Sequence, residues 1–283
     1  MSAVFYIMDY IQITIDNISQ ETSDQLVALM QGIGFEGFEE DERLLKAFIS
    51  NEKFDENNFN ILIEQNNLKY SKSIIKEVNW NQEWESGFEP VSIYSPKDNR
   101  LFVYLRADFH APNPTALFDL AITPKMSFGT GHHATTYLMI QQMADVDFNE
   151  KSVIDFGTGT GVLAILAEKL GAKEVIGIDH DDWSISNATE NINANNCCKI
   201  SLVKADSCVF QGKADILLAN INLNIIKENL SSIKNCLANS GTVLFSGILK
   251  NDLQDIEKAI KFTGLSIVEV LERDNWLLIK AVN

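Results

Sequence analysis

The chain has 283 residues, of which 46% are hydrophobic, and a formal net charge of −16. This length suits two domains better than one, and the hydrophobic content is high enough to bury real cores, which argues against global disorder. No apolar run approaches the ~18 residues that span a bilayer. Residues 1–10 have no basic region before their apolar stretch and include Asp9, so a secretory signal is not expected.

The negative charge argues against broad binding to nucleic acid phosphates, which requires clustered Lys and Arg. It favours a small-molecule substrate or a basic macromolecule, although good solubility explains an acidic surface equally well. The four cysteines, Cys197, Cys198, Cys208 and Cys236, form no C-x-x-C motif. We therefore expect reduced thiols in a cytoplasmic protein and neither a disulfide framework nor a zinc site.

The first 78 residues predict a small α+β domain. Apolar periodicity places strands at 4–15, 35–39, 44–49 and 70–78, and helices at 23–33 and 55–65. The order βαββαβ is that of the ferredoxin-like fold. Nothing in this segment indicates catalysis, and such a domain is usually structural or a binding platform.

Residues 79–100 predict a linker that contains an aromatic helix. Trp80 and Trp84 are four positions apart, which places them on one face of a helix. Phe88 and Pro90 follow. We favour packing of these aromatic side chains on a neighbouring domain; an aromatic patch facing the substrate is the alternative.

From residue 101 to residue 283 the pattern predicts an α/β domain. Short strands are expected at 101–105 and 119–122, and a helix at 137–143. Seven further strands are expected at 152–156, 174–179, 200–204, 214–219, 242–247, 265–271 and 275–281, and helices at 162–170, 182–195, 224–237 and 251–262. Strands separated by helices indicate parallel crossovers and a doubly wound seven-stranded sheet. The last two strands meet at a tight reversal, Glu272–Asp274, so the final strand should be antiparallel.

A glycine turn follows the strand at 152–156. Glycines at 157, 159 and 161 give G-x-G-x-G, whereas dinucleotide sites need G-x-G-x-x-G, and position 162 is Val162. Gly157 and Gly159 allow the backbone to approach a ligand closely. Asp179 ends the next strand, where a carboxylate can accept hydrogen bonds from both hydroxyls of a ribose. The glycine turn and Asp179 together predict a site for an adenosine cofactor, and the glycine spacing disfavours a dinucleotide.

Two further acidic residues are candidate cofactor contacts. Asp155, inside the strand, can reach forward to an amino group of the cofactor; bonding to the backbone of the glycine turn is an equally good explanation. Asp206 follows the strand at 200–204 and is expected near the adenine, with a solvated turn residue as the alternative.

Asn220 ends the strand at 214–219 and is the candidate catalytic residue. Its position at the carboxyl end of a parallel strand places it at the edge of the sheet where the cofactor is expected. Upstream, the glycine-rich loop 126–133 precedes a helix whose first turn would contain Thr135 and Thr136, next to free N–H groups. His132 and His133 lack partners at metal-ligand spacing, so we expect local hydrogen bonding and no metal.

Four motifs occur in one order: M-S-F-G-T-G-H-H-A-T-T, F-G-T-G-T-G, I-G-I-D and A-N-I-N. Together they resemble the ribosomal protein L11 methyltransferase (PrmA) family, class I S-adenosylmethionine-dependent methyltransferases. That family usually has M-A-F-G-T-G-T-H-P-T-T and A-N-I-L, so this chain departs at Ser127, His132, Ala134 and Asn222. The likeness extends through the linker to the first domain.

The resemblance implies S-adenosylmethionine as cofactor, held by Thr136, Gly157, Asp179 and Asn220, with Asn220 also orienting the acceptor. It implies methylation of amino groups, on lysines and the N-terminus, of a basic large-subunit ribosomal protein bound by residues 1–78. We expect a monomer that binds neither membranes nor nucleic acid stably. The alternatives are an amine of another protein or of a small molecule, or a non-catalytic, cofactor-binding assembly factor.

Overall fold

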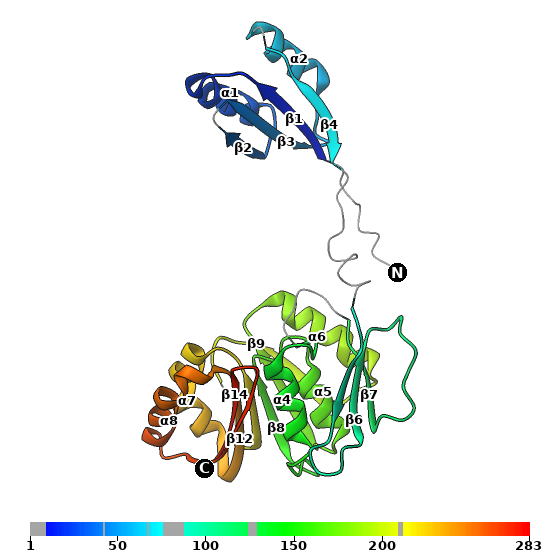
Figure 1. Ribbon diagram of the computed structural model, residues 1–283, viewed down its shortest axis with the longest axis vertical. Helices are drawn as coiled ribbons and strands as arrows, with labels where there is room; N and C mark the ends of the chain where they lie inside the picture. The colour runs from blue at the N-terminus through cyan, green and yellow to red at the C-terminus, as the bar shows by residue number, and fades with distance from the viewer. Residues whose placement is uncertain (1–9, 42, 67, 76–87, 124–128, 209–211) are drawn as a thin grey trace. The chain divides into compact units, whose positions relative to one another are not determined.

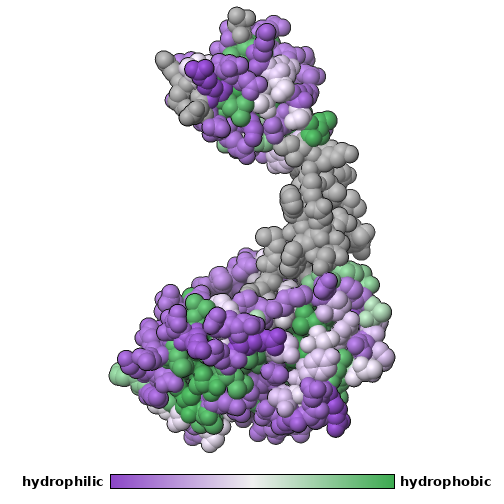
Figure 2. All heavy atoms as spheres, viewed as in Figure 1, coloured by the Kyte–Doolittle hydropathy of each residue, from purple (hydrophilic) through white to green (hydrophobic). Residues whose placement is uncertain are grey.

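The computed structural model describes residues 10–41, 43–66, 68–75, 88–123, 129–208 and 212–283. The chain divides into two compact units, Met1–Trp80 and Asn81–Asn283 (Figure 1). Hydrophilic residues cover much of the visible face of each unit (Figure 2). Among the described residues, none of the helices has both the length and the apolar character needed to cross a membrane.

The first unit is a four-stranded antiparallel sheet with two helices. Its elements are β1 (Tyr10–Asp16), α1 (Gln20–Gly32), β2 (Gly37–Asp41), β3 (Leu44–Ser50), α2 (Glu56–Gln65) and β4 (Ser71–Ile75), and the strand order is β2-β3-β1-β4. This is the predicted order of elements. Alternate residues of β1, Ile11, Ile13 and Ile15, are buried in the unit's core. The helix α1 begins three residues before the predicted start because the Ser19 side chain accepts a hydrogen bond from the N–H of Thr22.

The second unit opens with a three-stranded sheet that corrects the predicted linker. The strand β5 (Val91–Tyr94) pairs antiparallel with β6 (Leu101–Arg106), and β6 pairs in parallel with β7 (Phe118–Ala121). Val91–Tyr94 is therefore part of a folded sheet and not of a linker. Phe88 is buried and stacks edge-on against His132, with 4.9 Å between ring centroids. Trp80 and Trp84 lie outside the described residues.

A mixed sheet of seven strands forms the centre of the second unit. Its strand order is β10 (Ile200–Lys204), β9 (Glu174–Asp179), β8 (Ser152–Phe156), β11 (Ala214–Asn220), β12 (Leu237–Leu249), β14 (Trp276–Val282) and β13 (Ser266–Arg273). The strands from β10 to β12 run parallel, whereas β14 is antiparallel to both of its neighbours. The α/β class that the sequence predicts is confirmed.

Helices cover both faces of this sheet (Figure 1). The helices α4 (Ala134–Met143), α5 (Val162–Lys169) and α6 (Asp182–Ala194) contribute to one hydrophobic cluster, and α7 (Leu223–Cys236) and α8 (Leu253–Phe262) contribute to another. A short 3-10 turn, Lys250–Asp252, precedes α8.

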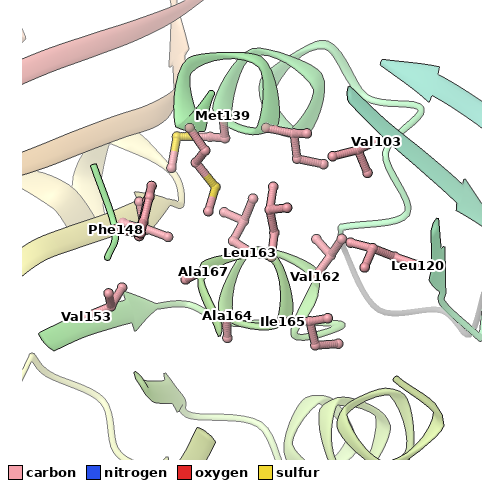
Figure 3. Close-up of a cluster of buried hydrophobic side chains, with 14 of the residues drawn as sticks. Val103, Leu120, Met139, Phe148, Val153, Val162, Leu163, Ala164, Ile165 and Ala167 are labelled. Carbon is pink, nitrogen blue, oxygen red and sulfur yellow. The ribbon is translucent and has the colours of Figure 1, made fainter. Parts of the chain in front are cut away.

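The strand β8 is buried on both faces, because Val153 packs into the first of these clusters and Ile154 into the second. Figure 3 shows the first cluster, where Leu163 of α5 and Met139 of α4 point toward one another. Two-sided burial explains why the central strands are mostly apolar. Asp155, inside β8, is a buried exception.

Candidate functional site

A cavity of about 750 Å³ lies at the carboxyl ends of the parallel strands. Six of the residues predicted from the sequence line it: Thr135, Gly157, Gly159, Asp179, Asp206 and Asn220. They come from the ends of β8, β9, β10 and β11 and from the start of α4, and parallel strands bring these ends to one edge of the sheet.

The glycine turn brings bare backbone to the cavity wall. Gly157 has φ +78°, and a Cβ added there would lie 2.1 Å from Cγ2 of Ile221. The residue must therefore be glycine for both its conformation and its space. The turn is joined to β9 because the N–H groups of Gly157 and Thr158 both donate to the carbonyl of Ile178, at 2.8 and 2.9 Å.

Asp179 is fixed by backbone donors while it remains on the cavity wall. Its Oδ2 accepts from the N–H of Gly159 at 2.9 Å, and its Oδ1 accepts from the N–H of Asp181 at 3.1 Å. The N-cap of α6 is Asp181, which accepts from Ser184, so capping does not occupy Asp179. Each carboxylate oxygen keeps acceptor capacity for a ligand hydroxyl.

Asp155 is not among the described residues that line the cavity, so its contact with a cofactor stays a prediction. Its Oδ2 accepts from the Thr158 hydroxyl at 2.7 Å and from the N–H of Ala164 at 3.2 Å. The side chain is buried, and burial raises the pKa of this carboxyl group to about 7. The structure thus favours the alternative, in which Asp155 supports the glycine turn and the start of α5.

Asp206 is exposed and lies on the cavity wall after β10. The loop that carries it is attached to α7, because the N–H of Cys208 donates to Oδ1 of Asn229 at 3.4 Å. The position of Asp206 fits the predicted contact with an adenine ring. Its exposed side chain is less restrained than that of Asp179, which accepts two backbone hydrogen bonds.

Asn220, which lines the cavity, is hydrogen-bonded to Thr136. Nδ2 of Asn220 donates to the hydroxyl of Thr136 at 3.2 Å, and both side chains are buried. Thr136 is buried and is not among the described residues that line the cavity, so a direct cofactor contact by Thr136 stays a prediction. Oδ1 of Asn220 is buried without a hydrogen-bond partner. A buried unsatisfied acceptor costs about 1–3 kcal/mol, so this oxygen favours a ligand that donates an N–H or O–H.

Thr135 and His133 form the N-terminus of α4. Nδ1 of His133 lies 2.8 Å from the Thr135 hydroxyl and accepts from the N–H of Thr135 at 3.4 Å. His133 is the N-cap of α4, and the helix consequently begins at Ala134 instead of at the predicted 137. The expected local hydrogen bonding of His133 is confirmed.

Sequence reasoning missed several residues of the cavity wall. Nδ1 of His180 lies 3.4 Å from Oδ1 of Asp179. The ring of Trp276 packs edge-on against that of His133, with 4.8 Å between ring centroids. Glu228, in α7, also lines the cavity. Adjacency to Asp179 was a usable signal for His180. Trp276 begins β14, far along the chain, and no local pattern marks it.

The cavity suits a cationic ligand. Asp179, Asp206 and Glu228 are acidic, and the described residues that line the cavity include no Lys or Arg. A sulfonium cofactor with a ribose and an amino acid part fits this wall, because the carboxylates attract its positive charge and Asp179 keeps acceptor capacity for ribose hydroxyls. The structure therefore agrees with the cofactor that the glycine spacing and the motif resemblance indicate.

Comparison with known proteins identifies the family. The sequence profile described as "Ribosomal protein L11 methyltransferase (PrmA)" matches residues 9–283. Curated proteins with the same name from Porphyromonas gingivalis and Bacteroides thetaiotaomicron are 38% and 35% identical to this chain, over 94% and 93% of its length and 92% and 94% of theirs.

A solved structure adds the likeness of fold. The crystal structure of a ribosomal protein L11 methylase from Lactobacillus delbrueckii subsp. bulgaricus matches with a TM-score of 0.58 at 30% identity, over 63% of this chain and 93% of that one. The chain therefore belongs to the ribosomal protein L11 methyltransferase (PrmA) family and is an S-adenosylmethionine-dependent protein methyltransferase.

Proposed function

We propose that this protein transfers methyl groups from S-adenosylmethionine to amino groups of ribosomal protein L11, namely lysine side chains and the N-terminal α-amine. The observation that carries the acceptor class is the buried, unpartnered Oδ1 of Asn220. An amine nitrogen that approaches this oxygen supplies the missing N–H donor, and the bond aims the nitrogen lone pair away from Asn220.

The acceptor amine must lose a proton before it can attack. A lysine has a reference pKa of about 10.4 and an α-amine one of about 7.7–8.0, and the neutral form is the nucleophile. S-adenosylmethionine supplies an electrophilic methyl group on a sulfonium. Asn220 acts by binding and orienting the neutral amine, because holding two reactants in line removes much of the entropic barrier. The proton leaves to water.

A hydrogen bond to Thr136 orients the side chain of Asn220. Its amide is tied to Thr136, which stands in the first turn of α4, so two elements determine where Oδ1 lies. Asp179 would hold the cofactor ribose, and Gly157 and Gly159 would let the backbone approach the cofactor. We propose Asp206 as the contact to the adenine.

We propose that the seven-stranded sheet is the class I methyltransferase core and that the first unit is a ferredoxin-like domain that recognises the substrate. The antiparallel order β2-β3-β1-β4 with two helices supports the ferredoxin-like assignment. Residues 1–80 contain 14 Asp and Glu and 6 Lys and Arg, a net charge of −8, and the other −8 is spread over residues 81–283. The first unit is thus the more densely acidic part and the better attractant for a basic protein.

Acetylation of L11 tests the acceptor class. Recombinant L11 is acetylated to block its amines and is compared with untreated L11 as substrate, with S-adenosylmethionine carrying a labelled methyl group. The proposal predicts labelling of the untreated protein alone. Equal labelling of the acetylated protein would show an acceptor other than an amine.

A further inference from the structure

The helix α6 carries a row of buried amides that the reaction as described does not use. Asn187, Asn191 and Asn195 recur at every fourth position and are all buried. This spacing places Asn187 and Asn191 on one face of the helix, and Asn195, the residue that caps its C-terminus, continues that face. Burying polar side chains is unfavourable unless they are hydrogen-bonded, so their partners indicate what they do.

Asn191 joins two segments that are distant in the sequence. Its Nδ2 donates to the carbonyl of Thr160 at 2.8 Å, and its Oδ1 accepts from the N–H of Thr123 at 2.8 Å. Thr160 belongs to the glycine turn, between Gly159, which lines the cavity, and Gly161. Thr123 lies just after β7.

Thr160 extends this chain of contacts. Its hydroxyl donates to the carbonyl of Gly129 at 3.0 Å, and a Cβ added at Gly129 would lie 2.6 Å from the same hydroxyl. Gly129 belongs to the glycine-rich loop that leads to Thr135 and Thr136. Asn191 and Thr160 therefore connect the glycine turn to the segment after β7 and to the loop that precedes α4.

We propose that Asn191 is a positioning residue of the cofactor site, which acts by holding the Thr160 peptide of the glycine turn at a fixed place relative to the segment after β7. The amide makes no contact with the cavity itself; it sets the position of Gly159 and, through Thr160, of Gly129. This inference rests on the cofactor and not on the identity of the methyl acceptor.

Asn195 provides a matched control four residues further along the chain. Its Oδ1 accepts from the N–H of Ala121 at 3.0 Å, and its Nδ2 donates to the carbonyl of Ala121 at 2.7 Å. Nδ2 also contacts the carbonyl of Asn191 at 2.8 Å. Asn195 is buried, as Asn191 is, and its bonds hold the end of β7, two residues before Thr123, but none of them reaches the glycine turn.

The test compares Asn191→Ala with Asn195→Ala by calorimetric titration with S-adenosylhomocysteine, the demethylated product. We expect the Kd to rise about tenfold in Asn191→Ala, the factor that corresponds to one buried hydrogen bond, and by less than about twofold in Asn195→Ala. Both variants should lower the thermal unfolding midpoint. With an acceptor present, KM for S-adenosylmethionine should rise more than kcat falls in Asn191→Ala.

Two results would overturn the proposal. One is an unchanged Kd in a folded Asn191→Ala variant, and the other is an equal rise in both variants, which would indicate general destabilisation. If Asn191→Ala does not fold, Thr160→Val removes the bond to Gly129 with little change of shape. That variant should also raise the Kd for S-adenosylhomocysteine, and an unchanged value would contradict the proposed chain of contacts.

Discussion

The side-chain amide of Asn220, at the end of β11, donates to the hydroxyl of Thr136, in the first turn of α4, at 3.2 Å. The two residues are 84 positions apart in the chain. The bond uses the donor side of the amide and leaves Oδ1 without a partner. One contact therefore both fixes the orientation of Asn220 and leaves its acceptor oxygen for a ligand.

Replacing Asn220 should separate turnover from cofactor binding. Asn220→Ala removes the acceptor for the amine, and we expect kcat to fall about 100-fold or more, as when a positioned catalytic hydrogen bond is lost. The Kd for S-adenosylhomocysteine, measured by calorimetry, should change by less than about threefold because Asp179 and the glycine turn remain. Asn220→Asp keeps an acceptor oxygen and should retain more activity than Asn220→Ala. Full turnover in the alanine variant would refute the assigned role.

Asp179 and Asp206 should differ in their effect on cofactor affinity. Asp179→Asn removes a fixed carboxylate, and losing charge-assisted bonds to the ribose should raise the Kd by about 10-fold to 100-fold. Asp206→Asn changes an exposed side chain and should raise it by about threefold or less. Titration of both variants with S-adenosylhomocysteine measures the difference, and a larger effect at Asp206 would reverse the ranking.

Gly157→Ala should destabilise the protein and abolish tight cofactor binding. The φ of +78° costs about 1–2 kcal/mol for an L-residue, and the new methyl group would collide with Ile221. Gly32→Ala is the control, because a Cβ at Gly32, the last residue of α1, meets nothing within 4 Å. Chemical denaturation should show a loss for Gly157→Ala and no loss for Gly32→Ala. Equal stability of the two variants would contradict the strain at Gly157.

Asp155 should make stability depend on pH in a defined window. Its pKa is raised from 3.8 to about 7 by burial, so between these values the folded state holds a proton that the unfolded state has lost. The stabilising contribution of this protonated carboxyl group to the free energy of unfolding is fully present below about pH 4 and is lost as the pH rises to about 7.

The matched variant is Asp155→Asn, which stays neutral and keeps an acceptor for Thr158 and Ala164. Urea denaturation at several pH values should measure the free energy of unfolding of Asp155→Asn minus that of the wild type. This difference should increase from about pH 4 to about pH 7 and stay constant above that. A difference that does not vary with pH would mean that the Asp155 carboxyl titrates normally in the folded protein.

Binding to L11 should weaken as the salt concentration rises. The first unit carries a net charge of −8 within 80 residues, and exposed charges are screened over about 10 Å at 0.1 M salt. Binding of L11 to the full chain, measured from about 0.05 M to about 0.5 M salt, should show a falling association rate constant. An association rate constant that does not change with salt would remove the electrostatic argument for the first unit.

The sequence predicted those parts of the structure that depend on local patterns. The strand ends at Gly157, Asp179 and Asn220 follow from apolar runs, and parallel strands bring such ends together. The two explanations for Asp155 could not be separated from the sequence, because its partners Thr158 and Ala164 are set by the path of the glycine turn.

Other features depend on tertiary contacts that no window of sequence contains. The sequence pattern predicts a linker where β5 lies, because only pairing with β6 defines this segment as a strand. Trp276 reaches the cavity only through the order of strands in the sheet. The buried amides of α6 look like the polar face of an exposed helix until Thr123 and Ala121 are placed against them.

The central claim is tested most directly by intact-mass spectrometry of purified L11 after incubation with this protein and S-adenosylmethionine, with Asn220→Ala in parallel. The account predicts mass gains in methyl-sized steps with the wild-type enzyme and almost none with the variant. No gain with the wild-type enzyme, while calorimetry shows that it binds S-adenosylhomocysteine, would contradict L11 as the acceptor.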